Sequence, residues 1–228
     1  MMKCVPIMAK KLDEAVTLVG DALAKGCDMI EWRIDCLEDK SKTELFKKTW
    51  ENMRELSDKP IIVTLRTTNQ GGKAHLSISQ YNDVLRKLID LIEIDYLDVE
   101  LITCGSDAKA KMFAHMAKQK GTKVIISYHD MQYTSCVRDI EMMLCRIKYI
   151  GADIPKVAYK ANSDEDVANL KQGALKANKQ IGDIVAISMG KLGQETRING
   201  DEFGSVINYT KPMGSAYTEN DNIGQVEL

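Results

Sequence analysis

The chain has 228 residues, of which 44% are hydrophobic and 28% are charged. A chain of this length can bury a sizeable core. Its 31 basic and 33 acidic residues leave a net charge of −2, which gives no general reason to expect nucleic acid or an anionic membrane as a partner. The sequence has no apolar stretch of membrane-spanning length and no signal-peptide cleavage pattern, so we expect a cytoplasmic protein.

Short apolar runs alternate with amphipathic segments along the chain. The runs predict eight strands, at residues 3–9, 29–34, 60–65, 96–101, 123–128, 155–159, 184–189 and 205–209. Helical periodicity predicts helices at residues 12–25, 42–56, 77–92, 107–120, 135–150 and 163–177, with a short one after Lys191. This alternation is typical of a (β/α)8 barrel, and steady strand spacing favours it over an open doubly wound sheet. No Pro- or Ser-rich linker divides the chain, so we expect a single barrel domain over residues 1–228.

The end of the chain departs from the usual barrel. After the eighth predicted strand, residues 210–228 are mostly polar. A barrel normally places a helix there to cover its wall. We therefore expect the last helix to be short or absent, or the exposed apolar strip to be covered by another chain.

Two reactive side chains lie on neighbouring predicted strands, His129 at the end of the fifth and Lys156 within the sixth. A buried lysine is costly unless its ammonium is paired or its pKa falls. A neutral lysine can attack a carbonyl and form a Schiff base, and a nearby histidine can move protons close to neutral pH. The pair suggests imine chemistry with a proton shuttle.

Other charged residues follow apolar strands, at the barrel end where chemistry normally lies. These are Glu31, Arg33, Arg66 and Arg197. Alternatives remain open for each feature. Glu31 and Arg33 lie on one strand face and can form a structural ion pair at the rim, Lys156 can be paired with Asp153, and His129 can be structural.

The remaining histidines and the cysteines give weaker signals. His75 lies in a glycine-rich loop and His115 on a predicted helix, so we expect both to be exposed or structural. The three histidines are too dispersed for a metal site. The six scattered cysteines contain no C-x-x-C pair, and we expect reduced thiols rather than disulfides or metal ligands.

An ordered set of motifs extends over nearly the whole chain. They are EWRID at 31–35, TLRT at 64–67 followed by a double glycine at 71–72, SYHD at 127–130, IPKVA at 154–158, ISMG at 187–190, TR at 196–197 and FGS at 203–205. Together they resemble the type I 3-dehydroquinate dehydratases of the shikimate pathway. The resemblance implies a (β/α)8 barrel that dehydrates 3-dehydroquinate to 3-dehydroshikimate without a metal or organic cofactor, and a possible homodimer.

The resemblance also implies residue roles. Lys156 forms the imine with the substrate ketone, and His129 abstracts the neighbouring proton and later protonates the departing hydroxyl. The substrate-binding positions match residues that hold hydroxyls or the carboxylate and residues of the closing loop: Glu31, Arg33, Arg66, Arg197, Ser215 and Gln225.

This chain departs from the family pattern near the reactive pair. Gln70 stands where the family usually has a glutamate that orients the histidine, and it cannot stabilise imidazolium by charge, so we expect weakened catalysis or a compensating acid. Lys160 replaces a typical methionine, and it can depress the pKa of Lys156 or be the reactive amine itself. The closing loop separates Ser215 from Gln225 by ten positions instead of four.

Two other functions stay open at the sequence level. One is another Schiff-base barrel enzyme of the aldolase type, which would need a phosphate site after strands seven and eight. The other is a weakened barrel that binds cyclic hydroxy acids without turnover, an alternative prompted by Gln70 and by the altered closing loop.

Overall fold

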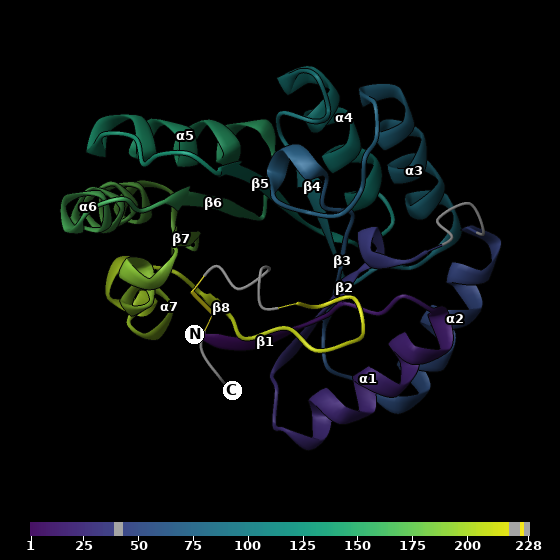
Figure 1. Ribbon diagram of the computed structural model, residues 1–228. Helices are drawn as coiled ribbons and strands as arrows, with labels where there is room; N and C mark the ends of the chain where they lie inside the picture. The colour runs from purple at the N-terminus through teal and green to yellow at the C-terminus, as the bar shows by residue number, and fades with distance from the viewer. Residues whose placement is uncertain (39–42, 219–223, 226–228) are drawn as a thin grey trace.

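The protein is described by a computed structural model that covers residues 1–38, 43–218 and 224–225. These residues form one sheet of eight parallel strands in the order β7-β6-β5-β4-β3-β2-β1-β8 (Figure 1). The strands are β1 (Met2–Ile7), β2 (Met29–Arg33), β3 (Ile61–Thr64), β4 (Tyr96–Glu100), β5 (Lys123–Asp130), β6 (Ile154–Lys160), β7 (Val185–Met189) and β8 (Ile207–Tyr209).

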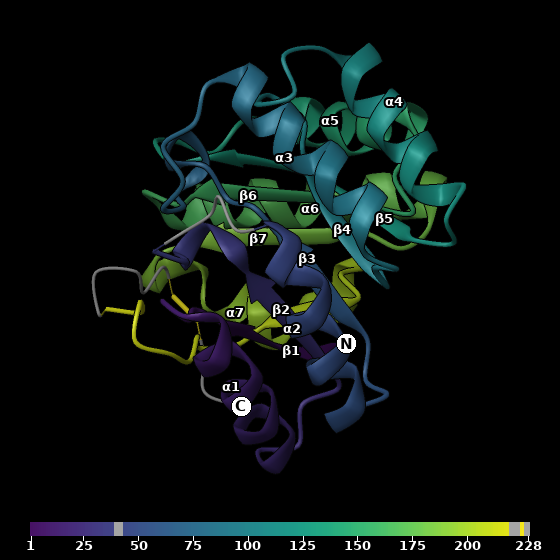
Figure 2. The same ribbon diagram turned by 90° about the vertical axis from the view of Figure 1, so that its right-hand side faces the viewer.

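Helices connect the strands and lie on the outside of the sheet (Figures 1 and 2). The α-helices are α1 (Leu12–Ala24), α2 (Thr43–Leu56), α3 (Ile78–Leu91), α4 (Asp107–Lys118), α5 (Val137–Ile150), α6 (Asp164–Ile181) and α7 (Glu195–Ile198). Short 3-10 turns follow three of the strands: η1 (Ile34–Cys36), η2 (Thr68–Gln70) and η3 (Lys191–Gly193). A fourth, η4 (Gly200–Phe203), lies between α7 and β8.

The barrel seam lies between β7 and β8. Strand β8 pairs with β1 over three residues, whereas its connection to the β7 side is the isolated bridge between Ile184 and Ser205. The bridge lies at the amino ends of both strands, so the sheet is a nearly closed barrel. The predicted (β/α)8 architecture is confirmed, and predicted strand and helix positions agree with the structure to within a few residues.

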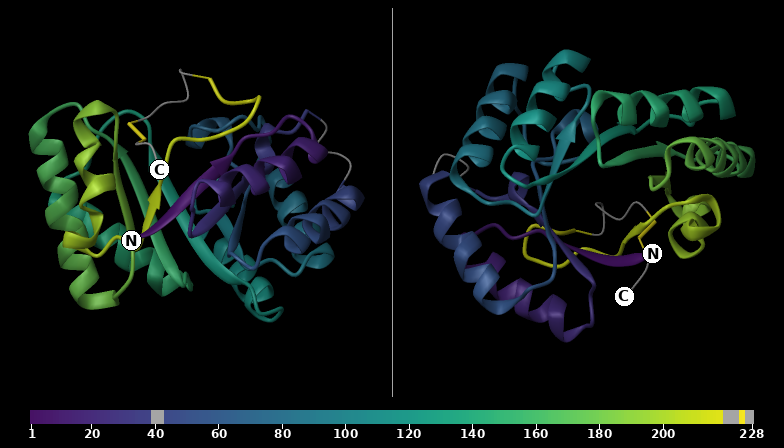
Figure 3. Two further views of the ribbon diagram at one scale, coloured as in Figure 1. Left: turned by 90° about the horizontal axis from the view of Figure 1, so that it is seen from below. Right: turned by 180° about the vertical axis from the view of Figure 1, so that it is seen from behind.

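The helical layer is interrupted between α7 and α1, beside β8 and β1 (Figures 1 and 3). No helix follows β8 in residues 210–218 or 224–225, in keeping with the expectation of a short or missing last helix. Residue 42, the predicted start of the second helix, lies outside the described residues. None of the helices in the described ranges is long and apolar enough to cross a membrane, and all six cysteines are free thiols.

Strand alternation divides the buried residues into two cores. Outward-facing residues such as Trp32, Val63 and Ile126 pack beneath the helices. Inward-facing residues such as Met29, Ile62 and Ile125 fill the lower barrel. Because side chains alternate along a strand, the next inward positions toward the carboxyl ends are polar. The sequence thus builds an apolar floor in the lower barrel. Above it lies a layer of buried polar and charged residues, here called the charged layer, which includes Glu31, Arg66 and Lys156.

Candidate active site

The charged layer surrounds a cavity of about 70 Å³ at the carboxyl ends of the strands. The cavity is lined by Pro6, Glu31, Arg33, Arg66, His129, Lys156, Ala158, Ile187, Arg197, Tyr209, Pro212 and Gln225. The structure therefore brings together all the predicted catalytic and substrate-binding residues except Ser215. Residues from β1, β2, β5, β6, β7 and β8 and from the segments that follow β3, β7 and β8 meet here.

Lys156 is buried in the middle of β6, with 4% of its surface exposed. Its Nζ lies 3.5 Å from Asp98 Oδ2 and 3.9 Å from Glu31 Oε1, and 3.8 Å from the centroid of the Tyr209 ring. Burial lowers the pKa of Lys156, and the two carboxylates oppose that shift. The amine is therefore more available as a nucleophile than an exposed lysine.

The alternative ion pair between Lys156 and Asp153 is wrong. Asp153 lies at the amino end of β6, where its carboxylate contacts Lys118 Nζ at 2.9 Å and accepts a hydrogen bond from the backbone N–H of Val124. The nearer of the two acids beside the amine is Asp98, which had no assigned role in the sequence motifs.

Asp98 and Glu100 alternate inward along β4 and hold Arg66. Arg66 Nη2 contacts Asp98 Oδ2 at 2.7 Å, and Nη1 contacts Glu100 Oε1 at 3.1 Å. Ser127 donates to Asp98 Oδ1 at 2.6 Å and accepts from Arg66 Nη1 at 2.8 Å. The arginine keeps the pKa of the Asp98 carboxyl low despite burial, so this network supplies fixed charges beside Lys156.

His129 lies near the carboxyl end of β5 and is partly buried. Burial and the cations Arg66 and Lys156 hold its pKa well below the usual value. Its Nδ1 has no hydrogen-bond partner among the described residues. A neutral imidazole at neutral pH is suited to act as a general base.

Gln70 contacts the main chain of His129. Its Oε1 accepts a hydrogen bond of 2.8 Å from the backbone N–H of His129, and its Nε2 lies 3.5 Å from the carbonyl oxygen of Asn69. Gln70 is therefore placed to hold the strand at His129, and the imidazole takes its charge state from burial and the surrounding cations.

Glu31 and Arg33 do not form the alternative ion pair with each other. Arg33 makes two 2.8 Å contacts to the carboxylate of Asp35, which is fully buried. Glu31 accepts a 2.8 Å hydrogen bond from Thr64 and faces Lys156. The two predicted residues are both present at the cavity, with separate partners.

Arg197, in α7, is 3% exposed and reaches across the seam of the barrel. Its Nη1 donates a 3.1 Å hydrogen bond to the carbonyl oxygen of Tyr209. Burial lowers the pKa of Arg197 to about 10. Its guanidinium also lines the cavity, where it can donate hydrogen bonds to an anion.

Lys160, the predicted modulator, is not among the lining residues of the cavity. A β-carbon added at Gly190 would lie 3.0 Å from Lys160 Nζ, which places the ammonium against the loop after β7. Burial is the main cause of the lowered pKa of Lys156, and the cation that adds to it is Arg66.

Ser215 and Gln225 lie in different places. Ser215 is exposed, and its backbone N–H and hydroxyl each donate a 2.7 Å hydrogen bond to Glu14 at the start of α1. Gln225 lines the cavity. The preceding Gly224 packs directly on Gly190, because a β-carbon at Gly224 would lie 2.2 Å from the Gly190 carbonyl oxygen.

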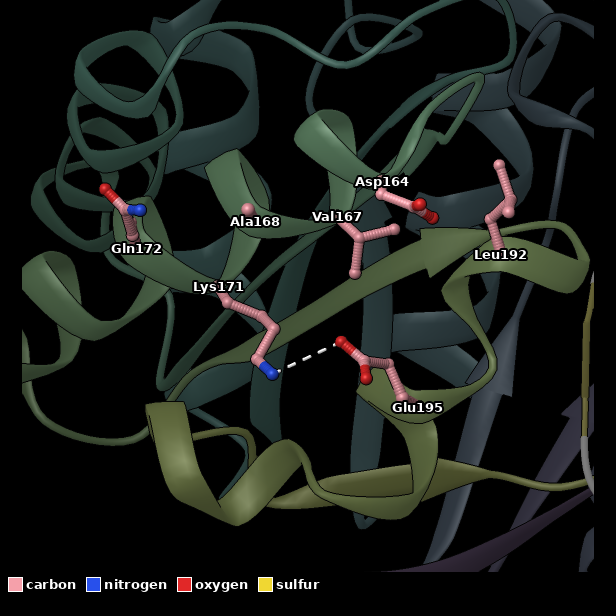
Figure 4. Close-up of a pocket in the computed structure, with 7 residues that line it drawn as sticks. All are labelled: Asp164, Val167, Ala168, Lys171, Gln172, Leu192 and Glu195. Carbon is pink, nitrogen blue, oxygen red and sulfur yellow. Dashed lines mark hydrogen bonds and ion pairs between the residues drawn. The ribbon is translucent and has the colours of Figure 1, made fainter.

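A larger groove of about 390 Å³ lies on the outer surface between α6 and α7 (Figure 4). Its side chains include the ion pair of Lys171 and Glu195 at 3.2 Å, and it holds none of the buried titratable groups. His75 and His115 are both exposed, as predicted. Within the described ranges, no group of three or more histidine, cysteine, aspartate or glutamate side chains could hold a metal ion.

A nearly closed ring of parallel strands, with a charged cavity at their carboxyl ends, defines this protein as a (β/α)8-barrel enzyme. The sequence profile described as Type I 3-dehydroquinase matches residues 3–227. The chain belongs to the type I 3-dehydroquinase family.

Individual relatives agree with this assignment. The 3-dehydroquinate dehydratase of Alkaliphilus oremlandii is 34% identical over 209 residues, which are 90% of this chain and 81% of that protein. A solved type I 3-dehydroquinate dehydratase from Clostridium difficile has a TM-score of 0.88 at 28% identity and covers 99% of this chain, with 87% of its own chain matched. The enzyme from Enterococcus faecalis has a TM-score of 0.86 at 28% identity, covering 92% of this chain and 88% of its own.

Proposed function

We propose that this enzyme dehydrates 3-dehydroquinate to 3-dehydroshikimate through a Schiff base on Lys156, with His129 as the general acid and base. The observation that carries the proposal is the shared cavity. A buried amine and an imidazole, both with lowered pKa values, line one cavity with three arginines. Family membership and the named relatives support the substrate and the overall reaction.

The proposed reaction begins at the amine. Neutral Lys156 attacks the substrate ketone, and loss of water gives a protonated imine. His129 then takes a proton from the carbon next to the imine, and the electron pair of that C–H bond passes into an enamine. As the enamine returns to an imine, the hydroxyl leaves with a proton from His129, and water hydrolyses the imine to release the product and Lys156.

The three arginines at the cavity suit it to an anionic substrate that carries hydroxyl groups. Arg33 and Arg66 are paired with protein carboxylates, so they can orient hydroxyl groups while their own charges are balanced. Arg197 is the proposed partner of the substrate carboxylate, because it lines the cavity and a planar guanidinium suits the two oxygens of a carboxylate. Glu31 and Gln225 also line the cavity and can contact the bound substrate. Substrate binding by Ser215 stays a prediction. It requires Ser215 to break its hydrogen bonds to Glu14 and move toward the cavity.

The working location and assembly are part of the same proposal. We place the enzyme in the cytoplasm, in the shikimate pathway, and expect a homodimer by family resemblance. Analytical ultracentrifugation of the pure protein tests the assembly, since a mass of one chain at micromolar concentration would exclude a stable dimer.

A turnover assay tests the reaction. With 3-dehydroquinate, the enone absorbance of 3-dehydroshikimate should grow with wild-type protein. It should fall by at least about a thousandfold in Lys156→Met, which lacks the nucleophile, and by about a hundredfold or more in His129→Asn. Arg54→Lys, on the outside of the barrel, serves as the matched control. Absence of product from well-folded wild-type protein would contradict the proposal and favour a barrel that binds cyclic acids without turnover.

A further inference from the structure

Tyr209 was assigned no role by the sequence patterns, yet it is in direct contact with the reactive amine. It is the last residue of β8, is 4% exposed and lines the cavity. The centroid of its ring lies 3.8 Å from Lys156 Nζ. A cation within about 6 Å of a ring centroid is attracted by the negative face of the ring.

The backbone holds this ring in place from two sides. Tyr209 is paired in register with Cys4 of β1, and Thr210 donates a 2.9 Å hydrogen bond to the Cys4 carbonyl oxygen. On the other side, Arg197 Nη1 donates to the Tyr209 carbonyl oxygen at 3.1 Å. One residue therefore contacts the amine through its side chain and Arg197 through its main chain.

We propose that Tyr209 is a positioning residue that holds the Lys156 nitrogen over its ring face in both cationic forms, the ammonium and the protonated imine. This inference rests on the proposed function for the imine form. The contact with Arg197 fixes the proposed carboxylate-binding group relative to the same ring. Tyr209 thereby sets the distance between the two ends of the substrate.

The ring suits this task because it attracts a cation without accepting its proton. Burial raises the pKa of the Tyr209 phenol well above its usual value, so the side chain stays neutral. Its hydroxyl has no hydrogen-bond partner among the described residues, which makes the ring face the part of the side chain with a defined contact. The titratable groups that influence Lys156 from the other strands are Cys4, Glu31, Arg66, Asp98 and His129.

The test measures the titration of Lys156 in the free protein. Competitive labelling with acetic anhydride across a pH series, read by mass spectrometry on the peptide that contains Lys156, gives the pH midpoint of amine reactivity. The exposed Lys25 is the internal standard. Tyr209→Leu removes the ring, and Tyr209→Phe keeps the ring without the hydroxyl.

We expect the midpoint for Lys156 to move to lower pH by about half a unit or more in Tyr209→Leu, because the ammonium loses a stabilising contact. Tyr209→Phe should stay within about 0.2 unit of wild type, since it retains the ring face. If circular dichroism shows that Tyr209→Leu is misfolded, Tyr209→Met gives the same test.

An unchanged midpoint without the ring would overturn the inference, as would an equal shift in Tyr209→Phe. The measurement needs no turnover. An inactive wild-type protein would therefore refute the proposed function and leave this readout intact.

Discussion

Lys156 is poised between two opposing effects. Burial favours the neutral amine, whereas Asp98 and Glu31 favour the ammonium at 3.5 and 3.9 Å. Burial is the larger effect, so the pKa is lowered. A lysine held in this way can be protonated at rest and still deprotonate readily enough to attack a ketone.

The sequence alone predicted Lys156 and His129 as a reactive pair, because a lysine or histidine within an apolar strand is unusual. It did not identify Asp98 or Tyr209. The signal for Asp98 was present in the alternation of Tyr96, Asp98 and Glu100, which places both acids on the inner face. Tyr209 could not be found this way, since an aromatic residue in a strand usually belongs to the core.

The contact of Gln70 with the His129 backbone also depends on the folded loop and has no sequence signal. It leads to a prediction for Gln70→Glu. The carboxylate can keep the 2.8 Å bond to the His129 N–H and adds a negative charge beside an imidazole that is surrounded by cations. The pKa of His129 should rise, and the acid limb of kcat/KM should move to higher pH.

We expect turnover at neutral pH to rise roughly threefold to tenfold in Gln70→Glu, because a stronger base speeds proton abstraction. Gln70→Met is the matched control, since it removes the backbone contact without adding charge, and its turnover should fall. An unshifted acid limb in Gln70→Glu would show that position 70 acts on the backbone alone.

At the scale of the elements, strand alternation made most of the site predictable. The inward positions of β2, β3, β5 and β6 follow from their apolar patterns, so the gathering of Glu31, Arg66, His129 and Lys156 at one end was expected. The segment after β8 was less predictable, because its path depends on contacts distant in sequence. Ser215 is bound to Glu14 of α1, a contact over 201 positions.

Gly224 gives a prediction for this segment. Its φ is +87°, and a β-carbon would lie 2.2 Å from the Gly190 carbonyl oxygen. Gly224→Ala should therefore prevent the segment from packing on Gly190 and should withdraw Gln225 from the cavity. Steady-state kinetics should show KM for 3-dehydroquinate raised by about tenfold, the cost of one lost hydrogen bond to the ligand.

Gly26→Ala is the matched control. Gly26 has a φ of +79° and no atom within 4 Å of an added β-carbon. The variant should lose about 1 kcal/mol of stability from backbone strain and keep the wild-type KM. An unchanged KM in Gly224→Ala would mean that the packed position of Gln225 is not used in substrate binding.

At the scale of the whole molecule, the barrel isolates a charged layer between the apolar floor and the mouth. Its architecture was predictable because eight apolar strands alternate with helices at regular spacing. The incomplete pairing at the seam was not predictable, since the sequence does not show whether β7 and β8 pair along their whole length. Here they are joined at their amino ends by the bridge of Ile184 and Ser205.

The buried site should also make stability depend on pH. His129 has a pKa well below its usual value in the folded protein, whereas the unfolded chain should titrate near 6.5. Between these values the unfolded state binds the proton and the folded state does not, so stability is lost as pH falls through this window. Asp35 and Asp98, whose pKa values are also lowered, act in the same direction at more acidic pH.

Urea unfolding at pH 7.5 and pH 5.0 measures this effect. We expect the free energy of unfolding to fall by about 1–2 kcal/mol at the lower pH, and His129→Asn to lose correspondingly less. Equal losses in the two proteins would show that His129 is accessible to protonation in the folded state.

The most direct test of the central claim is to locate the imine. Wild-type protein is incubated with 3-dehydroquinate, reduced with borohydride and digested, and the modified peptide is sequenced by mass spectrometry. Our account predicts one adduct, on Lys156, which is buried beside Asp98 and lines the cavity with His129. An adduct on Lys160 instead, or product formation with no trapped lysine, would contradict it.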